Sequence, residues 1–366
     1  MNDTTGLVLG IEIDGEGSHP AAWRRAAHPP AALFDPRRLV RLAEIAERAG
    51  FAFVTLDDDI LPPGTHPDVV GRIGSVERAA YLSSALSVLS VVPVVSTTYS
   101  EPFHVSSQLA SIDHLTAGRS GWVATVTGDP DAARAWGRPA VSGAAGLRQE
   151  AADAVEVVRA LWDSWEDDAV IRDIASSRYL DRERLHYVDF AGDSYSVKGP
   201  AIVPRSPQGQ LVVFAAAGLL PDHLVDVSLV GAPDLAGLRA AASRTARTFA
   251  EVEVALDTPG ELAAERVASL GRHGTWPDRG RLRYVGDAAG LVRLLGELAG
   301  LVDGVRLHPL VLEEDLDVLS RLVIPPLLIA RAVRSPLPGT TFRAVLGLPR
   351  PLSRYRAPSS TGGAKR

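Results

Sequence analysis

Short apolar segments alternate with amphipathic helical patterns along most of this chain of 366 residues, and this alternation constrains the fold more than any other feature. Eight apolar segments resemble strands that are buried on both faces, which is typical of parallel sheets. They start at Leu7, Phe51, Val91, Arg119, Leu211, Leu224, Val252 and Val305. Eight such units predict an α/β fold, a single closed (β/α)8 barrel. The alternative is an open doubly wound sheet, but no G-x-G-x-x-G follows the first strand.

The helical patterns, and one long segment that interrupts the alternation of strands and helices, predict the rest of the organisation. Helices are expected over Pro36–Gly50, Val76–Leu89, Pro102–Leu115, Leu147–Trp165, Leu235–Phe249, Glu261–Leu270 and Ala288–Leu298, with a further short strand at Arg283–Val285. From Glu166 to Gln210 the sequence is charged and rich in turns, so we expect an insertion around residues 166–210. Residues 1–356 are expected to form one barrel domain, and 357–366 a disordered tail.

Composition excludes several classes of protein. With 38 Lys+Arg against 44 Asp+Glu the net charge is −6, and no basic run is present, so we expect no nucleic-acid partner. The absence of cysteine excludes disulfides, thiolate metal sites and cysteine nucleophiles, and it fits a cytoplasmic location. Apolar stretches of about ten residues are too short to cross a membrane. The histidines lack the spacing of metal ligands, so no metal site is expected.

Several motifs resemble those of one enzyme family. Residues 96–104 read STTYSEPFH, and residues 109–122 read LASIDHLTAGRSGW. Similar pieces recur in order as LWDSWEDDA from Leu161, as VKGP from Val197, and near the end as VIP from Val323 and TFR from Thr341. Together they resemble the bacterial-luciferase-like, flavin-dependent monooxygenases, in particular the nitrilotriacetate and long-chain alkane monooxygenase branch.

This resemblance implies a fold and an activity. It implies a luciferase-like (β/α)8 TIM barrel that binds reduced FMN at the carboxyl ends of the strands and uses O2 to oxidise a small organic substrate. It also implies a separate flavin reductase as partner and a homo-oligomer, a dimer or a tetramer. Because the flavin carries out the difficult chemistry, no acid/base pair need appear in the sequence, and the catalytic residues stay unassigned.

Three polar positions of the resemblance are expected near the flavin ring. Asp58 ends the second strand, where the family has an acidic residue, although an Asp-Asp-Asp run can equally be a solvated turn or a helix cap. Thr97 and Thr98 end the third strand, and their hydroxyls can bond the flavin or the loop backbone.

The remaining cofactor positions depart from the family pattern. Val123 replaces an asparagine, while Thr125 and Thr127 keep hydroxyls for the ribityl chain. Aligned without gaps, Arg148 replaces a phosphate-binding tyrosine, and either holds the phosphate or is an ordinary exposed arginine. In the last phosphate element Gly218 is retained, but Leu219 and its neighbour are apolar where the family has serine.

These departures leave rival hypotheses open. One is a non-catalytic barrel that has lost flavin binding, since a phosphate beside apolar side chains would lack donors. Another is an oxidoreductase that uses the deazaflavin F420. His104 and His308 are further candidate site residues near the carboxyl ends of the strands. For each of them the alternative is a role in packing.

Overall fold

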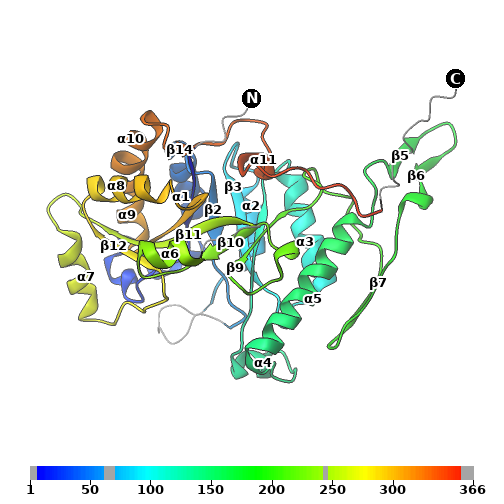
Figure 1. Ribbon diagram of the computed structural model, residues 1–366, viewed down its shortest axis with the longest axis horizontal. Coiled ribbons are helices and arrows are strands. Elements are labelled where there is room, and N and C mark those ends of the chain that lie inside the picture. Colours follow the sequence, from blue (N-terminus) through cyan, green and yellow to red (C-terminus); the bar gives the residue numbers. More distant parts are fainter. Residues whose placement is uncertain (1–5, 62–70, 242–245, 356–366) are drawn as a thin grey trace.

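The computed structural model describes residues 6–61, 71–241 and 246–355, and its centre is a closed barrel of eight parallel strands (Figure 1). Within the ring each strand pairs with two others, and the pairing of β10 with β11 closes it. Around the ring the strands are β1 (Leu7–Glu12), β2 (Phe53–Leu56), β3 (Ser90–Ser96), β4 (Gly121–Thr125), β9 (Val212–Ala216), β10 (Val227–Val230), β11 (Arg247–Leu256) and β13 (Gly304–Pro309). The eight predicted strands, and the closed barrel in place of an open sheet, are confirmed.

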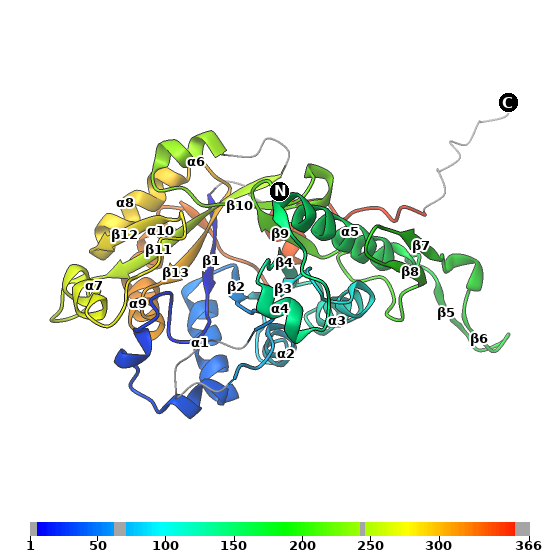
Figure 2. The ribbon, with the colours of Figure 1, turned by 90° about the horizontal axis from the view of Figure 1, so that it is seen from below.

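Helices cover the outside of the barrel, which is why the strands are apolar on both faces (Figure 2). They are α1 (Pro36–Ala49), α2 (Ser75–Leu82), α3 (Pro102–Leu115), α4 (Pro130–Ala135), α5 (Gly143–Asp163), α6 (Leu235–Ala241), α7 (Ala263–Gly271), α8 (Ala288–Leu298), α9 (Leu312–Val318) and α10 (Ile324–Ile329). Two short strands extend the sheet outside the ring, since β12 (Leu282–Gly286) pairs with β11 and β14 (Val333–Arg334) pairs with β1.

A cluster of phenylalanines fills the lower half of the barrel. The Phe53 ring centre lies 5.5 Å from those of Phe214 and Phe342, and 5.9 Å from that of Phe249. Phe342 comes from the short helix α11 (Phe342–Val345), which reaches the barrel from the C-terminal part of the chain. The neighbouring strands make room by having glycine: a Cβ on Gly10 would lie 2.1 Å from the Phe53 ring.

Two predicted helices were too long. The helix predicted over Val76–Leu89 ends at Leu82. The carboxylate of Glu47 accepts hydrogen bonds from the backbone N–H groups of residues 87, 88 and 89, which holds that segment in a loop. The helix predicted over Leu235–Phe249 is described as α6 up to Ala241, and its last predicted residues are strand instead, because Arg247 already pairs with β10 and the side chain of Phe249 belongs to the barrel interior.

The expected insertion contains two hairpins that project from one side of the barrel (Figure 2). They are formed by β5 (Val170–Asp173) with β6 (Arg178–Leu180), and by β7 (Val188–Ala191) with β8 (Ser196–Gly199). Trp165 anchors their base, because it is buried and its indole N–H donates to the carbonyl of Ala201 at 2.7 Å.

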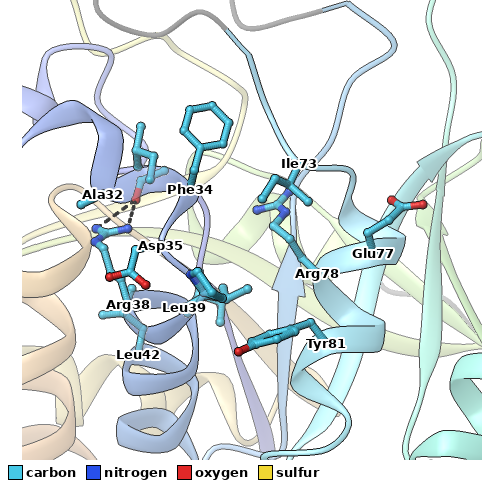
Figure 3. A pocket seen from close by; sticks show the side chains of 14 residues that line it. Ala32, Phe34, Asp35, Arg38, Leu39, Leu42, Ile73, Glu77, Arg78 and Tyr81 are labelled. Carbon is cyan, nitrogen blue, oxygen red and sulfur yellow. Dashed lines mark hydrogen bonds between the residues drawn. The ribbon is translucent and has the colours of Figure 1, made fainter.

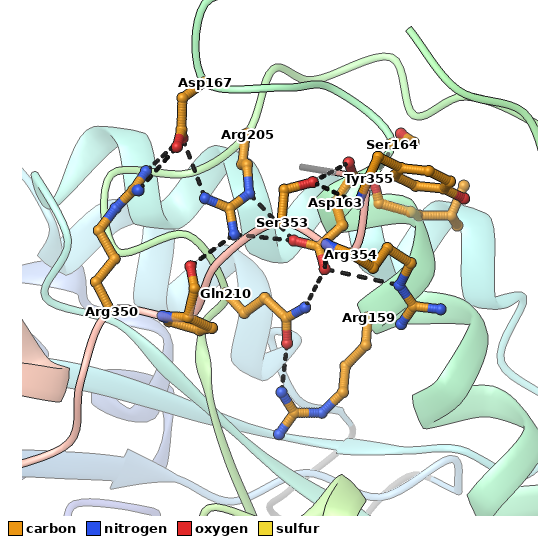
Figure 4. Close-up of polar contacts among 12 residues, drawn as sticks. Arg159, Asp163, Ser164, Asp167, Arg205, Gln210, Arg350, Ser353, Arg354 and Tyr355 are labelled. Atoms are coloured by element: carbon orange, nitrogen blue, oxygen red, sulfur yellow. Dashed lines mark hydrogen bonds and ion pairs between the residues drawn. The ribbon is translucent and has the colours of Figure 1, made fainter. Parts of the chain in front are cut away.

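The C-terminal segment is fastened to the end of α5 by a buried ion pair (Figure 4). Arg205 donates from Nε and Nη2 to the carboxylate of Asp163 at 3.1 and 3.0 Å, and from Nη2 to the carbonyl of Pro351. Arg350 and Arg205 also share Asp167. The predicted tail, 357–366, lies outside the described residues.

We expect Arg205→Met to lower the free energy of unfolding by about 3–5 kcal/mol, because it removes the buried cation of Asp163 and leaves only the partly exposed Arg354, 3.6 Å away. The side chains of this pair are 1% and 3% exposed. Urea unfolding followed by circular dichroism measures the change. The matched control is Arg178→Met, whose partner is Asp181 and whose side chain is 56% exposed, with an expected change below about 1 kcal/mol. Equal changes in the two variants would contradict the prediction.

Candidate active site at the mouth of the barrel

Strand alternation places charged side chains inside the upper half of the barrel, the half that lies toward the carboxyl ends of the strands. On β13, Val305 and Leu307 pack against the surrounding helices, so Arg306 and His308 face inward. The same parity directs Glu12 inward from β1 and Glu251 inward from β11. We call Glu12, Glu251, Arg306 and His308 the charge quartet.

The members of the charge quartet contact one another, and Arg281 adds a further ion pair to Glu251 at 3.4 Å. Arg306 donates from Nε and Nη2 to the two carboxylate oxygens of Glu251, at 2.5 and 2.9 Å. His308 is fully buried, with Nδ1 3.0 Å from Glu12 and Nε2 3.3 Å from Glu251. Since both ring nitrogens face carboxylate oxygens, each is placed to donate a hydrogen. The two carboxylates are thereby contacted by one guanidinium and one imidazole.

The quartet changes the acidity of its members. Burial raises the pKa of Glu12, but His308, Arg306 and Arg281 outweigh burial and lower the pKa to about 2. Burial likewise opposes ionisation of Glu251, yet Arg306 and His308 hold its pKa well below the usual value. Both acids are therefore ionised at neutral pH, and they set the electrostatic environment of the mouth above them.

A cavity of about 480 Å³ opens above the quartet, over β1 and β2; we call it the arginine cavity. Its charged lining comprises Asp14, Glu16, Asp57, Arg72, Arg78 and Arg279. Asp57 extends the inward series of β2, after Phe53 and Thr55. Burial, followed by the charges of Glu12 and Asp14, raises the pKa of Asp57 to about 6. The Asp57 carboxyl therefore takes up and releases a proton near neutral pH.

Hydroxyl groups line the other side of the mouth, where β3 and β4 end. Thr97 donates from Oγ1 to the carbonyl of Thr125 at 2.9 Å, and Thr98 accepts at Oγ1 from the N–H of Thr127 at 3.2 Å. The neighbouring Ser96 hydroxyl contacts the carbonyl of Thr98 at 3.4 Å. We call these five residues the hydroxyl edge. As the alternative interpretation of the sequence held, they bond the loop backbone.

The loop after β3 is held against the start of α5. Tyr99 has a left-handed backbone with φ +66°, which is uncommon for a residue other than glycine. Its hydroxyl accepts from the N–H of Val141 at 3.1 Å, and its own N–H donates to the carboxylate of Glu150. This brings the first turns of α5, and hence the exposed Arg148, to the same side of the mouth as the hydroxyl edge.

The other predicted cofactor positions are spread between the surface and the core. Val123 is buried in the cluster that contains the phenylalanines of the barrel interior. Gly218 is exposed in the turn after β9 with φ +75°, and no atom lies within 4 Å of where its Cβ would be. Leu219 is half-buried and packs against the core between α3 and α5.

Asp58 is a helix-capping residue in this structure. Its carboxylate accepts from the N–H of Ser75, the first residue of α2, at 2.6 Å, and from the N–H of Asp59 at 2.9 Å. It also lines a cavity of about 310 Å³ together with Ser96. Asp58 therefore lies near the hydroxyl edge, while the preceding Asp57 lies in the arginine cavity.

Most charged residues of the mouth were missed from the sequence. Of the quartet, only His308 is predicted from the sequence as a site residue. Of the two aspartates, the sequence predicts Asp58 and not Asp57. A sequence signal for inward charges was present, because charged or titratable residues occupy every second position near two strand ends. These are Glu12-Ile13-Asp14 and Arg306-Leu307-His308. His104, the other candidate, is exposed on α3.

Within the three described stretches of the chain, no group of three or more acidic or histidine side chains is arranged to hold a metal ion. Along these same stretches, no helix combines the length and the apolar character that a membrane span requires.

The comparisons with known proteins identify the family. The sequence pattern of the family described as luciferase-like monooxygenase matches residues 7–268, which is more than half of the chain. The chain belongs to the luciferase-like monooxygenase family, and the resemblance found in its motifs is confirmed.

Two relatives illustrate the range of the similarity. The chain is 37% identical over 213 residues to N-acetyl-S-(2-succino)cysteine monooxygenase of Bacillus subtilis (strain 168), a match that covers 57% of this chain and 48% of that protein. It is 30% identical over 228 residues to nitrilotriacetate monooxygenase component A of Aminobacter aminovorans, covering 59% and 50%. The chain thus spans about half the length of the curated relatives it matches.

Solved structures share the fold over nearly the whole chain. Riboflavin lyase RcaE superposes with a TM-score of 0.79 at 23% identity, covering 96% of this chain and 98% of that one. The long-chain alkane monooxygenase LadA also gives a TM-score of 0.79, at 20% identity, with coverages of 94% and 95%. The luciferase-like barrel predicted from the sequence is therefore confirmed.

We expect Asp57→Asn to change the pH dependence of stability. Because the folded-state pKa of Asp57, about 6, lies above that of a free aspartate, its neutral form stabilises the fold at low pH, and this contribution is lost as the pH rises through 6. Relative to the wild type, the variant should gain about 2–3 kcal/mol between pH 4 and pH 7, measured by urea unfolding. Asp59→Asn, at the exposed neighbour, is the control. A difference that stays constant with pH would refute the assignment.

Proposed function

We propose that this protein is a flavin-dependent monooxygenase that uses reduced FMN and O2 to oxidise a small organic substrate. Family membership supports the reaction class. The observation that carries the proposal is the hydroxyl edge, which offers unused hydrogen-bonding capacity at the carboxyl ends of β3 and β4, where barrel enzymes bind their ligands.

The hydroxyl edge fits the polar end of a flavin ring. Thr98 is fully buried and accepts a backbone N–H, so its own hydroxyl hydrogen reaches a carbonyl oxygen of the ring only if the loop that covers it moves. Thr97, which is 3% exposed, donates its hydroxyl hydrogen to the backbone, and the same movement would let its oxygen accept from a ring N–H. Neighbouring side chains thus present one donor and one acceptor, which is the pattern that the ring edge requires.

Fewer residues of this chain would contact the phosphate end of FMN. The open turn at Gly218 can bring backbone N–H groups to a phosphate, because no side chain covers it. Arg148 can add a charge-assisted contact from the first turns of α5. Thr125 and Thr127 would lie between them and the ring, along the ribityl chain. Val123 and Leu219 contribute no polar group, so fewer side-chain contacts to the cofactor are expected than in the family pattern.

A bound reduced flavin would supply the electrons for the reaction with O2. The residues of this chain would bind and orient it, and would manage protons in the mouth. Asp57 is suited to hold or release a proton at its carboxyl oxygens near neutral pH. The charge quartet below it fixes the position of the surrounding side chains, because each member is held by at least one other.

Two further parts of the proposal follow from this cofactor. The reduced flavin has to be delivered, so we propose a separate flavin reductase as partner; one relative is itself named as a component A. We propose a cytoplasmic location, which the absence of cysteine supports. A deazaflavin in place of FMN is the competing cofactor.

We expect FMN to bind, and the reduced form to bind more tightly than the oxidised form, in an anaerobic spectroscopic titration. Thr98→Val should weaken binding by about threefold to tenfold, since one hydrogen bond contributes about 0.5–1.5 kcal/mol. Ser176→Ala, on the projecting hairpin, serves as control. If neither form of FMN binds below about millimolar concentration, the proposal fails. A larger thermal shift with F420 than with FMN would assign the deazaflavin instead.

We further propose that the projecting hairpins form a contact between copies of the chain. Their region exposes Ile174, Tyr187 and Ile202, of which Ile174 is 93% exposed. Large apolar side chains gathered on a surface favour a protein interface. Light scattering should report a dimer or a tetramer, and Ile174→Asp combined with Tyr187→Asp should shift it to monomer. Ile329→Asp, on α10 and 85% exposed, should not. A monomeric wild type would exclude this contact.

A further inference from the structure

A second cavity adjoins the arginine cavity and continues it away from the mouth. It has a volume of about 310 Å³ and lies between the first turns of α1 and α2; we call it the helix groove (Figure 3). The two cavities share five lining residues, Gly15, Leu33, Phe34, Ile73 and Arg78. The shared residues include Arg78, which is ion-paired with Asp14, so the junction between the cavities is polar.

The helix groove is lined mainly by apolar side chains. Figure 3 shows Phe34 and Ile73 on opposite sides of the groove, with Leu39 and Tyr81 lower down. Phe34, Ile73 and Tyr81 are each at least 40% exposed, which is costly for large apolar groups that remain in water. The groove is therefore suited to a hydrocarbon chain or ring.

The arginine cavity holds guanidinium groups with unused donors. Nη1 of Arg72 is buried without a hydrogen-bond partner, and its nearest acidic atom, on Asp58, lies 3.6 Å away. Nε of Arg78 is also buried without a partner. Arg279 is exposed and lines the same cavity. Three arginines thus converge on a space that a ligand can enter.

Two of the three acidic residues of the cavity are already paired with cations. Asp14 is paired with Nη1 of Arg78 at 2.5 Å and with Nη2 of Arg72 at 3.9 Å, so these two arginines keep only their remaining donors for a ligand. Glu16 is held from the far side by Arg38 at 2.9 Å and by His28. Asp57 is the remaining acid, and Arg279 the cavity arginine that is not used by Asp14. The excess of free donors over free acceptors favours an anionic ligand.

We propose that the two cavities together bind an amphipathic organic carboxylate, with its carboxylate against Arg72, Arg78 and Arg279 and its apolar part in the helix groove. That this ligand is the substrate rests on the proposed function, because Asp57 and Asp58 lie on either side of the boundary between the arginine cavity and the hydroxyl edge. The charged end of the molecule is fixed by the arginines, and the length of its chain selects among carboxylates.

Calorimetric titration of the flavin-free full chain tests the proposal with octanoate as probe, and with octan-1-ol, octylamine and acetate as comparisons. Octanoate should bind most tightly. The alcohol lacks the charge, the amine carries the opposite charge, and acetate lacks the chain. Between butanoate and octanoate each added methylene should tighten binding by up to about fourfold while it still enters the groove.

Two variants separate the contributions of the two cavities. Arg72→Met should weaken octanoate binding about tenfold or more and leave octan-1-ol binding unchanged. The matched control Arg37→Met removes the same charge from an exposed position on α1 outside both cavities, and should bind octanoate as the wild type does. Phe34→Ser should remove the dependence on chain length without weakening the binding of acetate.

Three results would overturn the proposal: octylamine or octan-1-ol binding as tightly as octanoate, no saturation by octanoate below about 10 mM, or unchanged octanoate affinity in Arg72→Met. None of these measurements contains flavin. A failed FMN titration with intact octanoate binding would therefore remove the proposed function and leave the carboxylate site standing, whereas the opposite pair of results would remove only the carboxylate site.

Discussion

The mutual neutralisation of Glu12, Glu251, Arg306 and His308 is the constraint on which the upper half of this barrel depends. A parallel barrel directs every second residue of each strand inward, and an inward charge has no water to solvate it. These four polar side chains can be buried here because each lies within hydrogen-bond distance of another member of the set. Removing any one of them would leave a buried polar group without its partner, and this costs more free energy than keeping the complete set buried.

Below the quartet the barrel is apolar, and above it the mouth is polar, so one closed ring of strands provides both a core and a site. The mouth itself divides into two sides. Hydroxyls and an open glycine turn gather over β3, β4 and β9, whereas arginines and acids gather over β1 and β2. Asp57 and Asp58, adjacent in sequence, face the two sides separately, which suits a reaction between two different bound molecules.

The fold could be predicted from the sequence because parallel strands that are buried on both faces and separated by helices have few other solutions. The site was harder to predict. Asp58 matched the family pattern, but whether a residue caps a helix or faces a cavity depends on strand parity and on α2, which comes later in the chain. Glu251 is not predicted as a site residue, because residues 235–249 resemble a helix and the strand is therefore predicted to begin later than β11 does. Two of the cavity arginines, Arg72 and Arg279, come from loops, whose positions no periodicity reveals.

The phenylalanine cluster at the base of the barrel is completed by Phe342, which lies close to the C-terminal end of the described chain. The rings of Phe53, Phe214 and Phe249 contact one another but lack the fourth ring of the cluster until that residue has been synthesised. During translation most of the barrel leaves the ribosome with an uncovered aromatic base. The chain therefore has a built-in interval in which it can bind a chaperone or associate wrongly, and that interval ends only when α11 docks.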